Sequence, residues 1–156
     1  MRVHLVFVGK TGFSDVESAI SRYLERLKHY CQVQVHVVKA EKISAAIAED
    51  DVRSREGERI RKLWDGRGRL VILDQRGREL DSVQLSSFIQ KELDSGVSEM
   101  WMVIGGPVGV SPQLLKSADS VLSLSKMTLP HDLARLMLVE QLYRAFTIIK
   151  GEPYHK

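Results

Sequence analysis

Polar side chains near the end of the chain have types and a spacing that could move a proton or stabilise a negative charge. Glu140, Arg144 and Thr147 occur at i, i+4 and i+7 within a long apolar run, so a helix would place them on one face. Tyr154 and His155 follow in a short tail. A carboxylate, a guanidinium and an imidazole are groups that general acid–base catalysis uses. A surface ion pair between Glu140 and Arg144, with a frayed chain end, is the simpler alternative.

Two loops that precede these residues could hold a ligand. Gly105 and Gly106 end a buried apolar strand, where the absence of a side chain would let a ligand approach the backbone. Residues 125–129 follow the next predicted strand and lead into the last helix, which Thr128 and Pro130 suit as an entry. We expect the two strand ends to be adjacent and to form one crevice. A tight turn at 105–107 is the simpler interpretation.

Two common nucleotide-binding motifs are not matched. Gly9-Lys10-Thr11 resembles the end of a P-loop, but His4 occupies the position where that motif needs its first glycine. The glycines of 105–109 do not have the Gly-x-Gly-x-x-Gly spacing of a dinucleotide-binding fold. A cofactor in this protein would therefore bind in a different way.

Strand-like and helix-like segments alternate along the chain, with a turn expected at 74–77. Apolar or alternating runs predict strands at 3–8, 33–38, 70–73, 100–104 and 121–124. Helical spacing predicts helices at 14–29, 44–64, 82–94, 112–116 and 133–149. Ser14-Asp15 and Ser111 are the expected caps, and the 44–64 helix should be loosened at Gly57. The alternation predicts one α/β domain over residues 1–156, with a mainly parallel sheet.

The composition is that of a protein able to bury a core without a disulfide. The chain has 156 residues, a mass of 17.7 kDa and 44% hydrophobic residues. The apolar run 3–8 is too short to span a membrane and has no cleavage site, so we expect no signal peptide, no membrane association and a cytoplasmic location. Cys31 is the only cysteine, which argues against an internal disulfide, a structural zinc site and any metal.

Positive charge is concentrated in the middle of the chain. The net charge is +3, and residues 53–78 contain nine basic side chains against four acidic ones. One interpretation is a solvated helix face with internal ion pairs, such as Glu58 with Lys62. The other is an arginine-rich surface that contacts a phosphate backbone, which reversal of Arg53, Arg55 and Arg59 would test.

Four motifs in order resemble a known enzyme family. They are Ile-Gly-Gly-Pro-x-Gly-x-Ser-Pro at 104–112, Leu-Ser-Leu-Ser-x-Met-Thr-Leu-Pro-His at 122–131, Glu-Gln-Leu-Tyr-Arg-Ala at 140–145 and Pro-Tyr-His at 153–155. Together they resemble the bacterial large-subunit ribosomal RNA pseudouridine N3-methyltransferases, minimal members of the knotted SPOUT-type methyltransferases. The resemblance spans the whole length and is most specific in the last third. Val108 departs from it, because the family has an acidic residue there, and Lys126 replaces a small residue.

The resemblance implies a fold, a cofactor and an assembly. It implies a doubly wound sheet with a C-terminal trefoil knot, in which the end of the chain threads through a preceding loop. It implies a homodimer with the apolar last helix at the interface. It also implies S-adenosylmethionine bound in the knot by Leu73, Gly105, Gly106, Leu124, Ser125, Lys126, Met127, Thr128 and Leu129.

The implied activity is methylation of N3 of a pseudouridine in 23S ribosomal RNA, with the ribosome or its RNA as partner. His155 and Glu140 are then candidates for handling the proton, Arg144 for stabilising negative charge on the base, and Tyr154 for stacking on it or hydrogen-bonding to it. Two alternatives are a non-enzymatic RNA- or ribosome-binding factor and a related knotted tRNA methyltransferase.

Overall fold

The computed structural model describes residues 1–155 and contains alternating strands and helices, as predicted. The strands are β1 (Arg2–Val8), β2 (Gln32–Val38), β3 (Arg69–Glu79), β4 (Glu99–Ile104) and β5 (Ser120–Ser123). The helices are α1 (Ser14–Leu27), α2 (Glu49–Leu63), α3 (Ser82–Asp94), α4 (Pro112–Ser117) and α5 (His131–Ile149).

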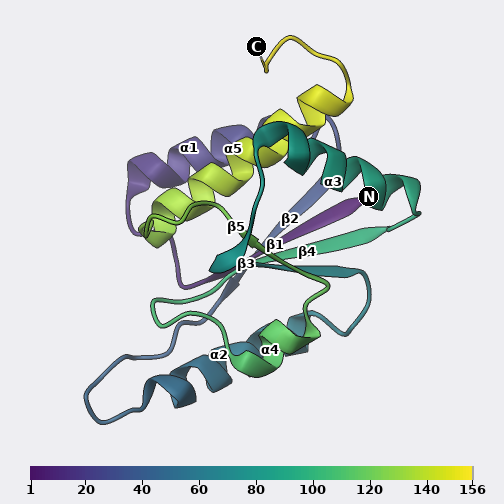
Figure 1. The fold of residues 1–156 in the computed structure, drawn as a ribbon. Helices are drawn as coiled ribbons and strands as arrows, with labels where there is room; N and C mark the ends of the chain where they lie inside the picture. Colours follow the sequence, from purple (N-terminus) through teal and green to yellow (C-terminus); the bar gives the residue numbers. More distant parts are fainter. Residues whose placement is uncertain (156) are drawn as a thin grey trace.

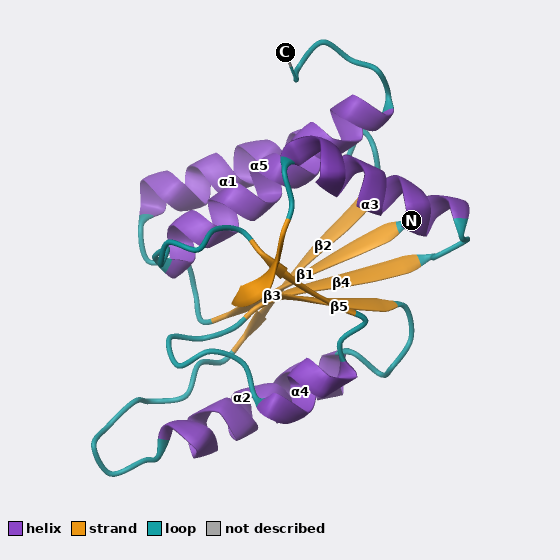
Figure 2. Cartoon of the chain, in the orientation of Figure 1, coloured by secondary structure: helices purple, strands orange, loops and turns teal. Residues whose placement is uncertain are grey.

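The strands form one parallel sheet in the order β2-β1-β4-β3-β5. Figure 1 shows α1, α3 and α5 on one face of this sheet and α2 with α4 on the other. Figure 2 shows the same three layers, with the strands between the two groups of helices. The predicted α/β class with a doubly wound, parallel sheet is therefore confirmed.

The sheet is apolar on both faces because helices cover both. Along β1, Val3, Leu5 and Phe7 belong to the core beneath α1, α3 and α5, while Val6 and Val8 belong to the core beneath α2 and α4. Alternate residues of a strand point to opposite faces. The near-continuous apolar run of the sequence follows from this double coverage.

Several predicted helix boundaries were wrong. The helix predicted from Ser44 begins at Glu49, and it continues through Gly57 without a break. Gly57 is required there by packing, because a Cβ atom on it would lie 2.6 Å from the Ser111 hydroxyl oxygen. The caps predicted at Ser14-Asp15 and at Thr128 were wrong, because Phe13 and Pro130 are the residues before α1 and α5 and neither has a side chain that could accept a capping hydrogen bond. The cap predicted at Ser111 is confirmed, since its hydroxyl accepts from the Leu114 amide.

The turn predicted at 74–77 is part of a longer strand that bends around β5. Leu122 of β5 pairs with Leu73 before the bend and with Arg78 after it. The bend is so close that a Cβ atom on Gly77 would lie 2.6 Å from the Leu122 carbonyl carbon. β5 therefore passes between two parts of the same strand. This is the local arrangement that a C-terminal knot requires; the trefoil knot itself stays a prediction.

Helix α5 packs between α1 and α3, although it is not buried on all sides. Leu138, Val139 and Leu142 are buried, whereas Leu133 and Met137 are 46% and 37% exposed. This stripe is apolar, and the homodimer interface expected on the last helix stays a prediction. Within residues 1–155, no helix combines the length and apolarity needed to cross a membrane.

Candidate functional site

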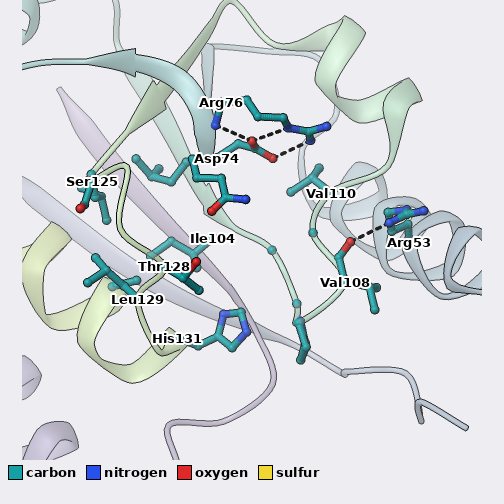
Figure 3. A pocket seen from close by; sticks show the side chains of 18 of the residues that line it. Arg53, Asp74, Arg76, Ile104, Val108, Val110, Ser125, Thr128, Leu129 and His131 are labelled. Carbon is teal, nitrogen blue, oxygen red and sulfur yellow. Dashed lines mark hydrogen bonds and ion pairs between the residues drawn. The ribbon is translucent and has the colours of Figure 1, made fainter.

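A cavity of about 500 Å³ opens where β3, β4 and β5 end. Its walls are the loop after β4, the loop between β5 and α5, the bend of β3 and the first turns of α2 and α5 (Figure 3). Lining side chains and backbone come from Glu49, Arg53, Leu73, Asp74, Gln75, Arg76, Ile104, Gly105, Gly106, Pro107, Val108, Gly109, Val110, Leu124, Ser125, Met127, Thr128, Leu129, His131 and Ala134. Its volume suits a small-molecule ligand.

The structure brings the predicted cofactor residues together with one exception. All of them line the cavity except Lys126, whose side chain is 82% exposed and whose Nζ lies 3.4 Å from Glu79 Oε2. One part of the prediction was wrong: β4 and β5 are not neighbours, because β3 lies between them. Leu73, at the bend of β3, therefore stands between the two loops.

The loop from Gly105 to Ser111, here called the glycine loop, is held in a tight turn. The Gly109 amide donates to the Gly106 carbonyl over 2.9 Å, and Gly109 has a φ of +84°, which side chains rarely adopt. Arg53 Nη1 donates to the Val108 carbonyl over 2.9 Å (Figure 3). The loop thus presents backbone to the cavity and is fixed from behind by α2.

Sequence reasoning missed several polar groups at the cavity. Asp74 accepts two hydrogen bonds from the Arg76 side chain, and these hold the pKa of the Asp74 carboxyl below its usual value (Figure 3). Burial lowers the pKa of His131, and the Arg135 guanidinium lowers it further. A neutral imidazole and an ionised carboxylate therefore face the cavity. In the sequence, only their positions pointed to these two groups: Asp74 follows Leu73, and His131 lies just after the loop at 125–129.

Glu140 and Arg144 of α5 form a compact polar cluster with Tyr154 of the C-terminal tail. Glu140 Oε1 accepts from Arg144 Nη2 over 2.6 Å and from the Tyr154 hydroxyl over 3.1 Å. The other carboxylate oxygen, Oε2, accepts from Gln141 Nε2 over 2.7 Å. The Arg144 guanidinium carbon lies 4.7 Å from the centre of the Tyr154 ring. Three of the four predicted catalytic residues are therefore in mutual contact.

This cluster has defined electrostatics but does not line the cavity. The hydrogen bond to Glu140 raises the pKa of Arg144. Burial raises the pKa of Tyr154, and its hydrogen bonds to Tyr23 and Glu140 raise it further. His155, the fourth predicted residue, is exposed. None of the four belongs to the cavity wall of the same chain.

Most of the basic segment is already paired with carboxylates. Arg59 lies 2.5 Å from Glu41, and Arg69 lies 2.7 Å from Glu92. The other pairs are Arg53 with Glu49 and Asp50, Arg55 with Glu41, Arg67 with Asp65, Arg69 with Asp119, and Arg76 with Asp74. Arg61 and Lys62, near the end of α2, are exposed and have no ion pair within the part of the chain that is described. The ion pair predicted between Glu58 and Lys62 is not formed within the described residues.

The fold and the sequence together define the class of protein. A family model described as a predicted SPOUT methyltransferase matches residues 1–155. The chain belongs to this family of methyltransferases.

Relatives with known names share its full length. A ribosomal RNA large subunit methyltransferase H from Syntrophobacter fumaroxidans is 52% identical over 157 residues, covering 100% of both chains. The protein of that name from Christiangramia forsetii is 41% identical and covers 99% of each chain. Among solved structures, the A. aeolicus TrmH/SpoU tRNA modifying enzyme is 16% identical with a TM-score of 0.49, covering 98% of this chain and 81% of its own. Structural similarity at that level adds nothing to the family assignment.

Proposed function

We propose that this protein uses S-adenosylmethionine to methylate N3 of a pseudouridine in 23S ribosomal RNA. The observation that carries the proposal is the cavity between the glycine loop and residues 124–129, found in a chain that belongs to a methyltransferase family. The full-length relatives named ribosomal RNA large subunit methyltransferase H support the choice of RNA as the substrate. The proposed location is the cytoplasm, where ribosomes are made.

The cavity has the chemical character that this cofactor needs. The backbone of the glycine loop and of residues 124–129 offers hydrogen-bonding groups, and Leu73, Ile104 and Leu129 offer apolar surface. The cofactor would contact Gly105, Gly106, Leu124, Ser125, Met127, Thr128 and Leu129, which line the cavity. When bound, S-adenosylmethionine supplies an electrophilic methyl group. The protein's own part is then to position the base and remove its proton.

The cluster on α5 and the tail suits the proton and charge requirements of this reaction. A bond from N3 to the methyl carbon forms as the sulfur–methyl bond breaks, and the N3 proton must leave. Glu140 and His155 are the proposed proton acceptors, and the Arg144 guanidinium would stabilise negative charge on the base. Tyr154 would stack on the base or donate a hydrogen bond to it. Glu140 also fixes the positions of Arg144 and Tyr154.

A homodimer would explain why this cluster does not line the cavity of its own chain. The exposed stripe Leu133 and Met137 on α5 offers an apolar surface for a second copy. A second copy packed on α5 would bring its tail towards the first copy's cavity. We propose that each active site combines the cavity of one protomer with the polar cluster of the other.

Calorimetric titration with S-adenosylmethionine tests the proposal first. Saturable binding to the folded protein is expected, whereas a folded protein that binds RNA without binding the cofactor would be an RNA- or ribosome-binding factor. The His155→Ala variant should bind the cofactor normally and lose turnover on ribosomes. Unimpaired turnover would remove the tail from the mechanism.

Mass mapping of modified nucleosides tests the substrate. A strain without the protein should lack one N3-methylated pseudouridine in 23S ribosomal RNA and recover it when the gene is restored. Loss of a tRNA modification instead would favour the alternative of a knotted tRNA methyltransferase.

The structure also changes which residues should be tested for RNA contact. Arg61 and Lys62 are exposed, and within residues 1–155 they lack carboxylate partners such as those that neutralise Arg53, Arg55 and Arg59. Charge reversal at Arg61 and Lys62 should weaken RNA binding and reduce its salt dependence. Equal binding by this variant and the wild type would leave α2 as an ordinary solvated surface.

A further inference from the structure

Glu56 of α2 is a buried carboxyl group behind the glycine loop. Glu56 is 2% exposed, and its Oε1 accepts a hydrogen bond from the Glu41 amide over 2.9 Å. Oε2 is buried and has no hydrogen-bond partner within the described residues. Burial of an acid with one unpaired oxygen is costly, so its retention calls for a physical reason.

Oε2 is in close contact with Gly106. A Cβ atom built on Gly106 would lie 2.6 Å from this oxygen, so a larger residue there would force the Glu56 side chain or the loop to shift. Gly106 itself is part of the cavity wall, whereas Glu56 is not. Glu56 therefore contacts the glycine loop from the side away from the ligand.

Two neighbours on α2 hold the same loop. Arg53, one turn earlier, donates to the Val108 carbonyl over 2.9 Å. Gly57 packs so closely against Ser111 that a Cβ atom on it would lie 2.6 Å from the Ser111 hydroxyl oxygen. The helix thus touches the loop at its beginning, middle and end, and Glu56 supplies the contact at Gly106.

We propose that Glu56 is a positioning residue, which sets the backbone of Gly106 for cofactor binding without touching the cofactor. This inference rests on the proposed function, because it assumes that the cavity binds S-adenosylmethionine. Small displacements of a positioning group are known to reduce activity by about 100-fold. Three of the seven residues of the glycine loop are glycines, whose backbone is flexible, so contacts from α2 would help to fix it.

The charge state of Glu56 follows from its surroundings. Burial raises the pKa of its carboxyl, and the nearby Glu41 carboxylate acts in the same direction, while the Glu41 amide and the Arg59 guanidinium oppose the rise. The groups that face it are therefore Glu41 and Arg59. An uncharged acid gives its full contribution to stability below the ordinary pKa of glutamate, and this contribution is lost as pH rises through the raised value. The neutral form is the one that packs on Gly106 at least cost.

Substitutions at Glu56 separate positioning from catalysis. The Glu56→Ala variant should raise both the Kd and the KM for S-adenosylmethionine by about tenfold or more, with kcat at saturating cofactor nearly unchanged. Glu56→Gln keeps the size of the side chain and its contact with Gly106, so its Kd should stay near that of the wild type. Glu58→Ala is the matched control, because Glu58 lies on the exposed face of the same helix. Calorimetry and thermal unfolding would be measured on each variant.

A second pair of variants tests the contact even if Glu56→Ala fails to fold. Gly106→Ala directs its new methyl group at Oε2 rather than into the cavity, and should weaken cofactor binding. Shortening the acid by one methylene in Gly106→Ala/Glu56→Asp should restore part of that loss. Such a recovery would show that the effect passes through this contact.

The possible outcomes are distinct. If the wild type does not bind S-adenosylmethionine, the proposed function fails. If the wild type binds but Gly106→Ala has the same Kd, the positioning role is wrong. It is also wrong if folded Glu56→Ala binds as the wild type does, if Glu56→Gln loses as much affinity as Glu56→Ala, or if Glu56→Ala reduces kcat alone.

Discussion

At the scale of single residues, the immediate neighbours decide how much of a formal charge is available. Arg59 contacts Glu41, and Arg76 contacts Asp74, so neither presents a free guanidinium to an RNA phosphate. Exposed ion pairs of this kind add little stability, but they do reduce the local potential. The count of nine basic residues against four acidic ones therefore overstates the positive surface. Acids outside the counted segment, such as Glu41, supply part of the compensation.

Cys31 gives a direct test of a half-buried titratable group. Burial raises the pKa of its thiol to about 11. Since the thiolate is the reactive form, iodoacetamide at pH 8 should modify the folded protein much more slowly than the protein in denaturant. Mass spectrometry over time would measure both rates. Similar rates in the two states would show that the thiol is accessible and ionises normally.

At the scale of elements, a buried arginine joins the start of α5 to the loop after β1. Arg135 is 2% exposed and donates to the Val8 carbonyl over 2.7 Å and to the Thr11 hydroxyl over 3.2 Å. Asp132, one turn earlier, accepts from the amides of Gly12 and Phe13. The same turn of α5 carries His131 into the cavity. The loop after β1 therefore supports one wall of the site.

Replacing Arg135 with Met should destabilise the protein. The substitution leaves the Val8 carbonyl without its donor and Asp132 without its nearby cation, at a cost of about 3 kcal/mol. Urea unfolding would measure the loss. Arg22→Met, at an exposed position on α1, is the control and should change the stability by less than about 0.5 kcal/mol. Equal stability of the two variants would contradict a structural role for the buried guanidinium.

The bend of β3 around β5 predicts a second sensitive position. A methyl group at Gly77 would meet the backbone of Val121 and Leu122, which cannot move aside as a flexible side chain would. Gly77→Ala should therefore lower the free energy of unfolding by about 2 kcal/mol or more. Arg78→Ala, next to it and exposed, is the control in the same urea experiment. An unchanged free energy of unfolding for Gly77→Ala would mean that the bend can widen at little energetic cost.

At the scale of the whole molecule, a three-layer fold concentrates its ligand surface at one edge of the sheet. The bend of β3 and the loops after β4 and β5 meet there, because these parallel strands run in the same direction. The polar cluster of α5 and the tail lies outside this cavity in one chain. The proposed homodimer would bring the cavity of one protomer next to the polar cluster of the other.

Negative charges introduced at the exposed stripe of α5 should dissociate the proposed homodimer. Leu133→Glu with Met137→Glu would place two carboxylates in the proposed interface, so the variant should sediment as a monomer and lose methyl transfer. Analytical ultracentrifugation measures the mass, and calorimetry would show whether the monomer still binds the cofactor. Val37→Glu, on the exposed part of edge strand β2, should leave the dimer intact. A dimer in the α5 variant would place the interface elsewhere.

The sequence by itself determined the order and type of the elements, because hydrophobic periodicity and helix caps are local properties. Leu70 to Leu73 and the Ser111 cap show this, and so does the choice of the two loops that line the cavity. Tertiary structure decided what depends on distant contacts: the bend of β3 around β5, the place of β3 between β4 and β5, and the pairing of Arg59 with Glu41. Gly57 looked like a helix breaker and is a packing contact, since only the folded chain brings Ser111 against it. Long-range contacts of this kind leave no local pattern, so only the folded chain reveals them.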